Sequence, residues 1–509
     1  MNVRMRTSVR RFLSRRTPPI RRLPVELLEV IFSYYVHETR ANSPAFYISE
    51  SPASMISSHP ASIVNPMTLG GVCRQWRQIS RSLAFLWSKF YISHPKKEHV
   101  KQSIYWLLLA RNSPLTIRIS SFTGKPTRKE FLVMRRLFDL FILNYNSWHS
   151  IDIHVSHHFH SLFLQVPNYP PPILQSVRLE LGQSLPPSPR VQRAVDILYS
   201  SPTLQDVAWT SAHYNMSTAS KKYPQWATLT HFVHHQVFLH NNLTVNDSIT
   251  ILDACPVLES LDVRIYPPDG RKLSHSIWLP LTHSHLRSFT AATNPTLLPK
   301  LIESLILPAL EELTIHDTQI DFLNPGLKTA APILDLLERS SCILREFELL
   351  TYSAPEDVIL NLISAPQFQG IRKIRLAGIK TERTIDLLTR KRADPQSLAV
   401  LPLLEHLTFF TYPSFRSPLD TSIKAIKRML LSRRDKSILS SLDNDIYMSL
   451  LMYANLELGK LDFWDYIQLA KLGNADFTII PSYHVPALRQ WTSLIRGQFL
   501  QIRAYVHEF

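Results

Sequence analysis

Two groups of histidines are the residues of this chain whose types and spacing come nearest to a metal site. Imidazole is a common zinc ligand, but neither group has a cysteine or a carboxylate at ligand spacing. We therefore interpret both groups as parts of surface loops and strand ends, and we expect no metal. The first group is His157, His158 and His160, and the second is His231, His234, His235 and His240.

Catalytic signatures are missing from the rest of the sequence. Glycine is scarce, with 11 residues in 509, and no Gly-rich phosphate loop occurs. Neither a Gly-x-Ser-x-Gly elbow nor a His-Glu-x-x-His motif is present. Cys73 is a conceivable nucleophile, but it lies on the apolar stripe of a predicted helix, where a packing thiol is expected. The sequence therefore predicts a protein that is not an enzyme and has no cofactor.

The clearest helical patterns lie near the start of the chain. Residues 23–35 and 69–79 each place apolar side chains on one stripe at helical spacing. Pro24 suits a first helical turn, and Glu26 and Glu29 favour the positive end of the helix dipole. Two helices this short cannot bury their stripes alone, so they must pack on each other and on a neighbour.

These two pieces resemble an F-box, in the versions common among fungal F-box proteins. The resemblance implies a helical module that docks on a Skp-family adaptor and, through it, on a cullin–RING ubiquitin ligase. The motifs that carry it are Leu23-Pro24, Glu26-Leu27-Leu28, Ile31-Phe32, Val72-Cys73-Arg74-x-Trp76 and Leu86-Trp87. The implied adaptor-binding residues are Leu23, Pro24, Leu27, Leu28, Ile31, Leu69, Val72, Cys73 and Trp76.

One departure from the family pattern separates the two pieces. F-box helices follow one another closely, whereas here residues 38–66 intervene and are rich in Ser, Pro, Ala and His. Long surface insertions cost little loop-closure entropy, so we expect a loop grown out of a helix junction. Such a loop can also shield or reshape the docking face.

A strand-like pattern repeats along the next 300 residues, with apolar residues at positions 1, 4 and 6 of each copy. When the weaker copies Leu229/Phe232 and Leu286/Phe289 are counted as well, spacings between copies run from roughly 24 to 34 residues, within or somewhat above the leucine-rich-repeat range. Amphipathic segments lie between the copies, and stacked strand–helix units of this kind build one continuous core. Clear copies are Trp148/Ile151/Ile153, Leu174/Val177/Leu179, Leu204/Val207/Trp209, Leu258/Leu261/Val263, Leu310/Leu313/Ile315, Leu344/Phe347/Leu349, Ile371/Ile374/Leu376 and Leu404/Leu407/Phe409.

The cadence resembles the irregular leucine-rich repeats that often follow an F-box. The predicted fold is α/β, an N-terminal helical F-box-like module followed by a curved leucine-rich-repeat-like α/β solenoid; a generic α/β domain is the alternative. The predicted divisions are a basic tail (1–22), the module (23–95, with the insert 38–66), the solenoid (100–420) and a helical C-terminal cap (421–509).

Polar residues between the core positions of the strands should face away from the helices. They are the candidate surface for a target protein, although solvated strand faces are polar in any case. The candidates are Asp152, His154, Arg178, Glu180, Arg264, His316, Glu348 and Arg375.

The positive charge of the chain is concentrated at its start. Residues 1–25 hold eight arginines and no acid, which accounts for half of the formal net charge of +16. The tail is read as a nuclear address, an anion-binding arm, a mitochondrial-type presequence or a solvated extension. The remaining body is only mildly basic, so nucleic acid is not expected as its partner. No apolar run is long enough to span a membrane, and scattered cysteines fit a reducing compartment, cytoplasmic or nuclear.

The sequence thus predicts a substrate receptor of an SCF-type ubiquitin ligase, with an unidentified target protein. The alternatives are a non-degradative interaction scaffold and a nuclear or nucleic-acid-associated factor that acts through the basic tail.

Overall fold

The computed structural model divides the chain into two compact units, residues 1–213 and 214–509. The division falls inside the predicted solenoid, not at its ends. The residues described are 23–37, 56–59, 65–121, 125–182, 188–209, 224–234, 243–265, 280–293, 296–317, 329–350, 354–377, 382–390, 400–410, 423–434, 453–458 and 477–481.

The N-terminal unit begins with a small group of helices. Cys73, in an extended conformation, separates the second helix from the third and caps the third, its sulfur accepting from the Trp76 amide at 3.4 Å. The Phe32 and Trp76 rings meet edge to face at 4.8 Å, which joins the first helix to the third. The elements are α2 (Val25–His37), α3 (Met67–Val72), α4 (Arg74–Ser82) and the 3-10 turn η2 (Ala84–Trp87).

Part of the insert between α2 and α3 is not a surface loop. Ser57 forms an antiparallel bridge with Tyr91 through two backbone hydrogen bonds of 3.0 and 3.1 Å. Ile56 beside it is fully buried. The described part of the insert therefore pairs with the edge strand, a contact between main chains that side-chain patterning does not reveal. The remainder, residues 38–55 and 60–64, lies outside the described residues.

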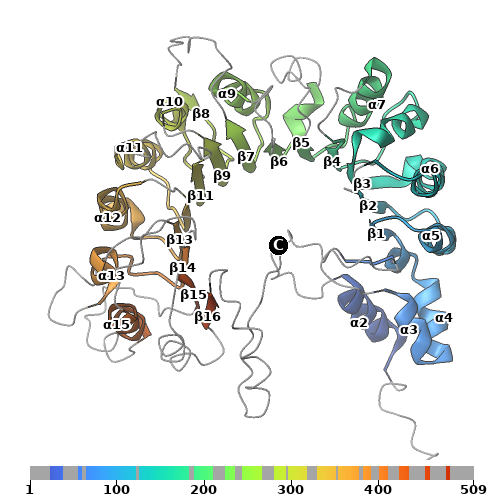
Figure 1. Cartoon of the computed structure of the whole chain (residues 1–509), viewed down its shortest axis with the longest axis horizontal. Helices are drawn as coiled ribbons and strands as arrows, with labels where there is room; N and C mark the ends of the chain where they lie inside the picture. The colour runs from blue at the N-terminus through green and yellow to red at the C-terminus, as the bar shows by residue number, and fades with distance from the viewer. Residues whose placement is uncertain are drawn as a thin grey trace, which may run out of the picture. The chain divides into compact units, whose positions relative to one another are not determined.

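The rest of the N-terminal unit alternates helices with parallel strands. Five strands pair in chain order, and the described helices cover one face of this sheet (Figure 1). The strands are β1 (Lys89–Ser93), β2 (Leu115–Ser121), β3 (Trp148–Val155), β4 (Ser176–Glu180) and β5 (Asp206–Trp209), and the helices are α5 (Lys97–Ala110), α6 (Arg128–Ile142), α7 (Pro189–Tyr199) and the 3-10 segments η3 (Tyr145–Ser147) and η4 (His157–Gln165).

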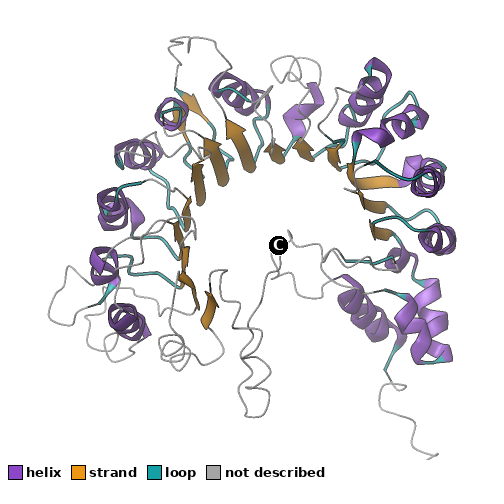
Figure 2. Cartoon of the chain, in the orientation of Figure 1, coloured by secondary structure: helices purple, strands orange, loops and turns teal. Residues whose placement is uncertain are grey.

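The C-terminal unit continues the same alternation, again with its described helices on one side of the strands (Figure 2). Its main sheet follows the order β6 (His231–His234), β7 (Ser260–Ile265), β9 (Ser288–Thr293), β11 (Glu312–Asp317), β12 (Glu346–Leu350), β13 (Lys373–Ala377), β14 (His406–Phe410), β15 (Tyr453–Leu458) and β16 (Phe477–Pro481), and a separate pair joins β8 (Leu281–Thr282) to β10 (Leu305–Ile306). The helices are α9 (Val245–Ala254), α10 (Leu298–Ile302), α11 (Ala331–Ser340), α12 (Glu356–Ser364), α13 (Glu382–Leu388), α15 (Ile423–Arg434) and the 3-10 segments η5 (Pro224–Thr228) and η6 (Pro366–Phe368).

The repeated strand pattern is the basis of the core in both units. In every clear copy the described side chains at the three apolar positions are at most 3% exposed. Strands with this pattern bury one face against the helices. Each repeat completes its hydrophobic core by packing in parallel against the next repeat. The mixed α/β, solenoid-like part of the predicted fold is therefore confirmed. None of the described helices has the length and apolar character needed to cross a lipid bilayer.

The predicted helical cap at 421–509 is only partly helical where the structure describes it. The helix α15 is present, but β15 and β16 follow it and pair in parallel with β14 and with each other. Aromatic residues such as Tyr453 suggested helices because short strand segments also satisfy a helical apolar spacing. The strand cadence thus extends past residue 420.

Candidate functional site

Helix α2 carries apolar side chains on two sides. One side, with Leu28, Phe32 and Val36 one turn apart, is fully buried against the module. The other side remains exposed, although it is also apolar. We call this side the exposed apolar face of α2, and it consists of Leu27, Val30, Ile31, Tyr34 and Tyr35.

This exposed face is continuous with the start of α3. The Tyr35 hydroxyl lies 3.4 Å from the Thr68 hydroxyl, which brings the end of α2 beside α3. On α3, Met67 and Val72 are also exposed. Clustered apolar side chains in water are unfavourable by about 25 cal/mol per Å², so patches of this kind commonly mark sites of protein contact.

The predicted adaptor-binding residues divide by burial. Leu27, Ile31 and Val72 are exposed, and so is Pro24, whereas Leu23, Cys73 and Trp76 are half-buried. Leu28 and Leu69 are buried inside the module and are not available for contact, since they form its own core. Four further exposed residues were not predicted, although counting both apolar sides of α2 would have found the first three: Val30, Tyr34, Tyr35 and Met67.

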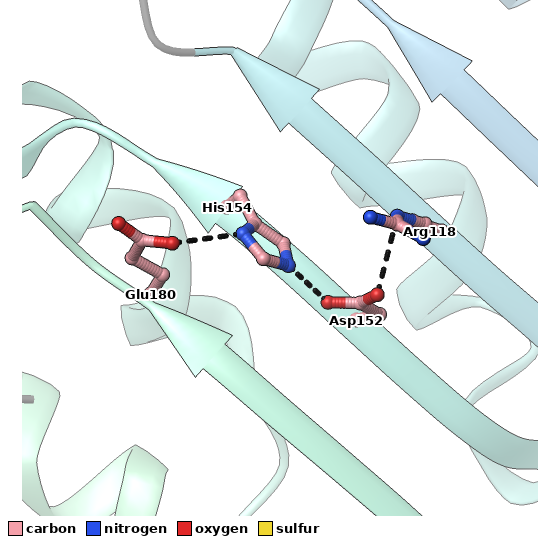
Figure 3. A network of polar contacts seen from close by, with 4 residues as sticks. All are labelled: Arg118, Asp152, His154 and Glu180. Atoms are coloured by element: carbon pink, nitrogen blue, oxygen red, sulfur yellow. Dashed lines mark hydrogen bonds and ion pairs between the residues drawn. The ribbon is translucent and has the colours of Figure 1, made fainter. Parts of the chain in front are cut away.

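A network of charged side chains crosses the first repeats on the face of the sheet away from the described helices, which we call the distal face. His154 on β3 donates from Nδ1 to Glu180 on β4, at 2.9 Å, and from Nε2 to Asp152 on its own strand. Arg118 Nε on β2 lies 3.2 Å from the other oxygen of Asp152. Figure 3 shows that the four side chains form a chain across three strands.

The geometry requires His154 to be protonated at both nitrogens, since each faces a carboxylate. Burial by itself would lower the pKa of His154, but the hydrogen bonds and negative charges of Asp152 and Glu180 outweigh it and raise the pKa above its usual value. Burial likewise opposes ionisation of Asp152, yet His154 and the neighbouring arginines hold the pKa of that carboxyl below its usual value. The network is therefore a set of mutually stabilised charges.

A related cluster lies on the distal face of the C-terminal unit, with a carboxylate at its centre. Glu348 on β12 accepts from Arg375 on β13 at 2.7 Å, and His316 Nε2 on β11 lies 3.8 Å from its other oxygen. Burial raises the pKa of Glu348, and the charge of Arg375 opposes that rise. Next to it, Lys373 Nζ contacts Glu346 at 2.5 Å.

All eight predicted target-binding residues lie on strands, between core positions. The structure joins six of them into the two clusters, while Arg178 on β4 and Arg264 on β7 lie outside these two sets of ion pairs. Sequence reasoning missed Arg118, Glu346 and Lys373. Their place in the strand pattern, directly before or after a core position, was the available signal.

The histidine groups do not form a metal site among the described residues, where no set of three or more potential ligands converges. His157 and His158 have ring centroids 3.9 Å apart, and His160 contacts the Leu181 carbonyl at 2.6 Å. In the second group, His235 and His240 lie outside the described residues.

Comparisons with known proteins identify no family. No protein-family model matches the chain, and no curated protein matches it. Among solved structures, a protein of Bacteroides fragilis is 13% identical with a TM-score of 0.34, covering 50% of this chain and 73% of its own. A chain of the yeast Rad7–Elc1 complex is 11% identical with a TM-score of 0.40, covering 70% of this chain and 88% of its own. These likenesses are too distant to assign a function.

Proposed function

We propose that this protein is a substrate-receptor subunit of an SCF-type ubiquitin ligase. The helical module docks on a Skp-family adaptor, and the repeats hold a target protein. The single observation that carries the proposal is the exposed apolar face of α2, which lies where the F-box-like motif predicts adaptor contact. A helix that is buried on one side and apolar on the other fits a module with one partner missing.

The proposed role involves no bond chemistry in this chain. The adaptor would link the module to a cullin–RING ligase, and the distal face of the repeats would hold the target near the ligase's active partner. Such an arrangement accelerates transfer by raising the local concentration of target lysines. The charged clusters on the strands supply directional contacts for selecting the target.

The test is adaptor binding by the purified full chain, measured by isothermal titration calorimetry with a Skp-family adaptor. The double variant Leu27→Asp, Ile31→Asp should weaken binding by about 30-fold or more, because buried anchors at an interface contribute most of its energy. The two residues are 51% and 42% exposed, so the fold should survive their replacement.

Leu132→Asp is the matched control, since Leu132 on α6 is 48% exposed but lies outside the docking face. It should leave adaptor binding unchanged. Absence of adaptor binding by the unaltered, folded chain would reject the receptor function and favour a non-degradative scaffold. Equal losses in the control and the double variant would reject the exposed apolar face as the docking site.

A further inference from the structure

We propose that the distal face of the N-terminal unit binds an acidic segment of the target protein, with Arg178 receiving a target carboxylate. This inference rests on the proposed role of the repeats as the target-binding part. It adds the chemistry of the partner, which neither the fold nor the sequence motif specifies.

Arg178 lies in the middle of a row of residues in register across the sheet. Its register neighbour on β3 is Asp152, and that on β5 is Ala208. Beyond Asp152 the row continues to Arg118 on β2. Arg178 thus has one carboxylate on one side and, on the other, a residue with no polar group in its side chain.

The acidic side chains of this face are already engaged. Asp152 is held by Arg118 and His154, one at each oxygen, and Glu180 accepts from His154. Asp206 accepts from the Ser176 hydroxyl at 2.9 Å. Within the part of the chain that the structure describes, none of these carboxylates forms an ion pair or a hydrogen bond with the Arg178 guanidinium.

A half-buried guanidinium without an acceptor is an unfavourable arrangement that a bound anion relieves. Its planar fork of N–H donors matches a carboxylate, which accepts two parallel hydrogen bonds. Asp152 lies near enough for the charge of Arg178 to help hold down the pKa of that carboxyl, but its oxygens already have donors. Since no described residue supplies the acceptor, this place is open to a carboxylate of the target.

The charge balance of the face favours an acidic partner over a basic one. The strands present Lys89, Arg118 and Arg178 against three acids, and protonated His154 gives the face a net positive charge. A basic segment would have to compete with Arg118 and His154 for Asp152 and Glu180, and it would meet only Asp206 outside the ion pairs. An acidic segment can bind Arg178 without disturbing the network.

The experiment is photo-crosslinking of the full chain with a hexaglutamate peptide that carries a benzophenone, followed by mapping of the adducts by mass spectrometry. Mapping separates this face from residues 1–25, whose arginines also attract the probe. We expect adducts on β3 and β4, and Arg178→Gln should reduce their yield about tenfold, since a charge-assisted hydrogen-bonded pair is lost.

The matched control is Arg193→Gln, which removes the same charge from the exposed side of α7 in the same unit. It should leave the adducts on β3 and β4 unchanged. Unchanged yields in Arg178→Gln, or stronger labelling by a hexalysine probe, would overturn the proposal. So would an oligothymidylate of equal charge that displaces hexaglutamate from this face more effectively than unlabelled hexaglutamate does.

Adaptor binding is measured on the same samples, so that the two proposals fail separately. Adaptor binding without Arg178-dependent adducts rejects only the acidic-partner inference. Adducts without adaptor binding reject the receptor function, while the face retains its preference for an acidic segment.

Discussion

Helix α2 of the module and helix α7 of the repeats treat their apolar side chains in opposite ways. Helix α7 of the repeats buries its apolar residues against the sheet, whereas α2 buries one side and leaves a second apolar side in water. A repeat completes its core with the next repeat, so its helices need only one apolar side. Among the residues that the structure describes, the module has no such neighbour on its second side, which is the side that the proposed adaptor would cover.

The two regions also differ in the electrostatic environment that they give to a histidine. His37, at the end of α2, lies beside Lys89, and burial together with that positive charge lowers its pKa to about 4. In the repeats, His154 lies between two carboxylates that raise its pKa. His37 of the module is therefore kept neutral, while His154 of the repeats is kept charged.

The largest expected effect is the difference in stability cost between two alanine substitutions. One replaces a buried residue of the repeats, and the other replaces an exposed residue of the module. Trp148→Ala should cost about 3–5 kcal/mol of stability, because a fully buried indole leaves a cavity. The indole also donates to the Phe141 carbonyl at 2.9 Å. Leu27→Ala should change stability by less than about 0.5 kcal/mol, since the side chain is already in water. Urea unfolding followed by hydrogen exchange of β2–β4 and of α2 measures both, and similar costs would contradict the comparison.

The next effect concerns a charged residue that the repeats bury completely. Arg433 on α15 donates to the carbonyls of Leu388, Val400 and Leu401 at 2.6–2.9 Å. Arg433→Met should cost about 2–4 kcal/mol, because buried carbonyls lose their donors. Hydrogen exchange of α13 and α15 measures the loss. Leu431→Ala, on the exposed side of the same helix, is the control and should have little effect.

The contrast between Trp148 and Arg433 shows how far sequence reasoning reaches. Trp148 occupies the first position of a repeated apolar pattern. Such a pattern depends only on residues that are close together in the chain, so it can be recognised in the sequence. Nothing in the sequence around Arg433 signals its burial, because its acceptors lie 32 to 45 residues earlier in the chain. The Ser57 bridge and the pairing of His154 with Glu180 were hidden for the same reason. Candidate positions could be predicted, but their partners depend on the register between strands.

A smaller loss of stability should follow from removing one charge from the network in the repeats. Asp152→Asn should cost about 1–2 kcal/mol, as charged hydrogen bonds to Arg118 and His154 are lost. It should also lower the pKa of His154, which NMR of the histidine ring measures directly. With a raised pKa in the folded state, the stabilisation from His154 is complete below its unfolded value and is lost as pH rises through the folded value. Unchanged titration of His154 in the variant would contradict the assigned network.

The smallest effect is the opposite pH dependence expected of the module. Because the folded pKa of His37 is depressed, its protonation favours the unfolded state, and stability falls as pH drops from about 6.5 towards 4. After discounting for the partial exposure of the ring, we expect a loss of about 1 kcal/mol. His37→Phe should remove this acid sensitivity from the hydrogen exchange of α2, corrected for intrinsic rates. His154→Gln is the control and should leave it intact, because the two histidines act in separate regions. If His154→Gln abolished the acid response of α2, the module and the repeats would be one titrating system, and the distinction between them would fail.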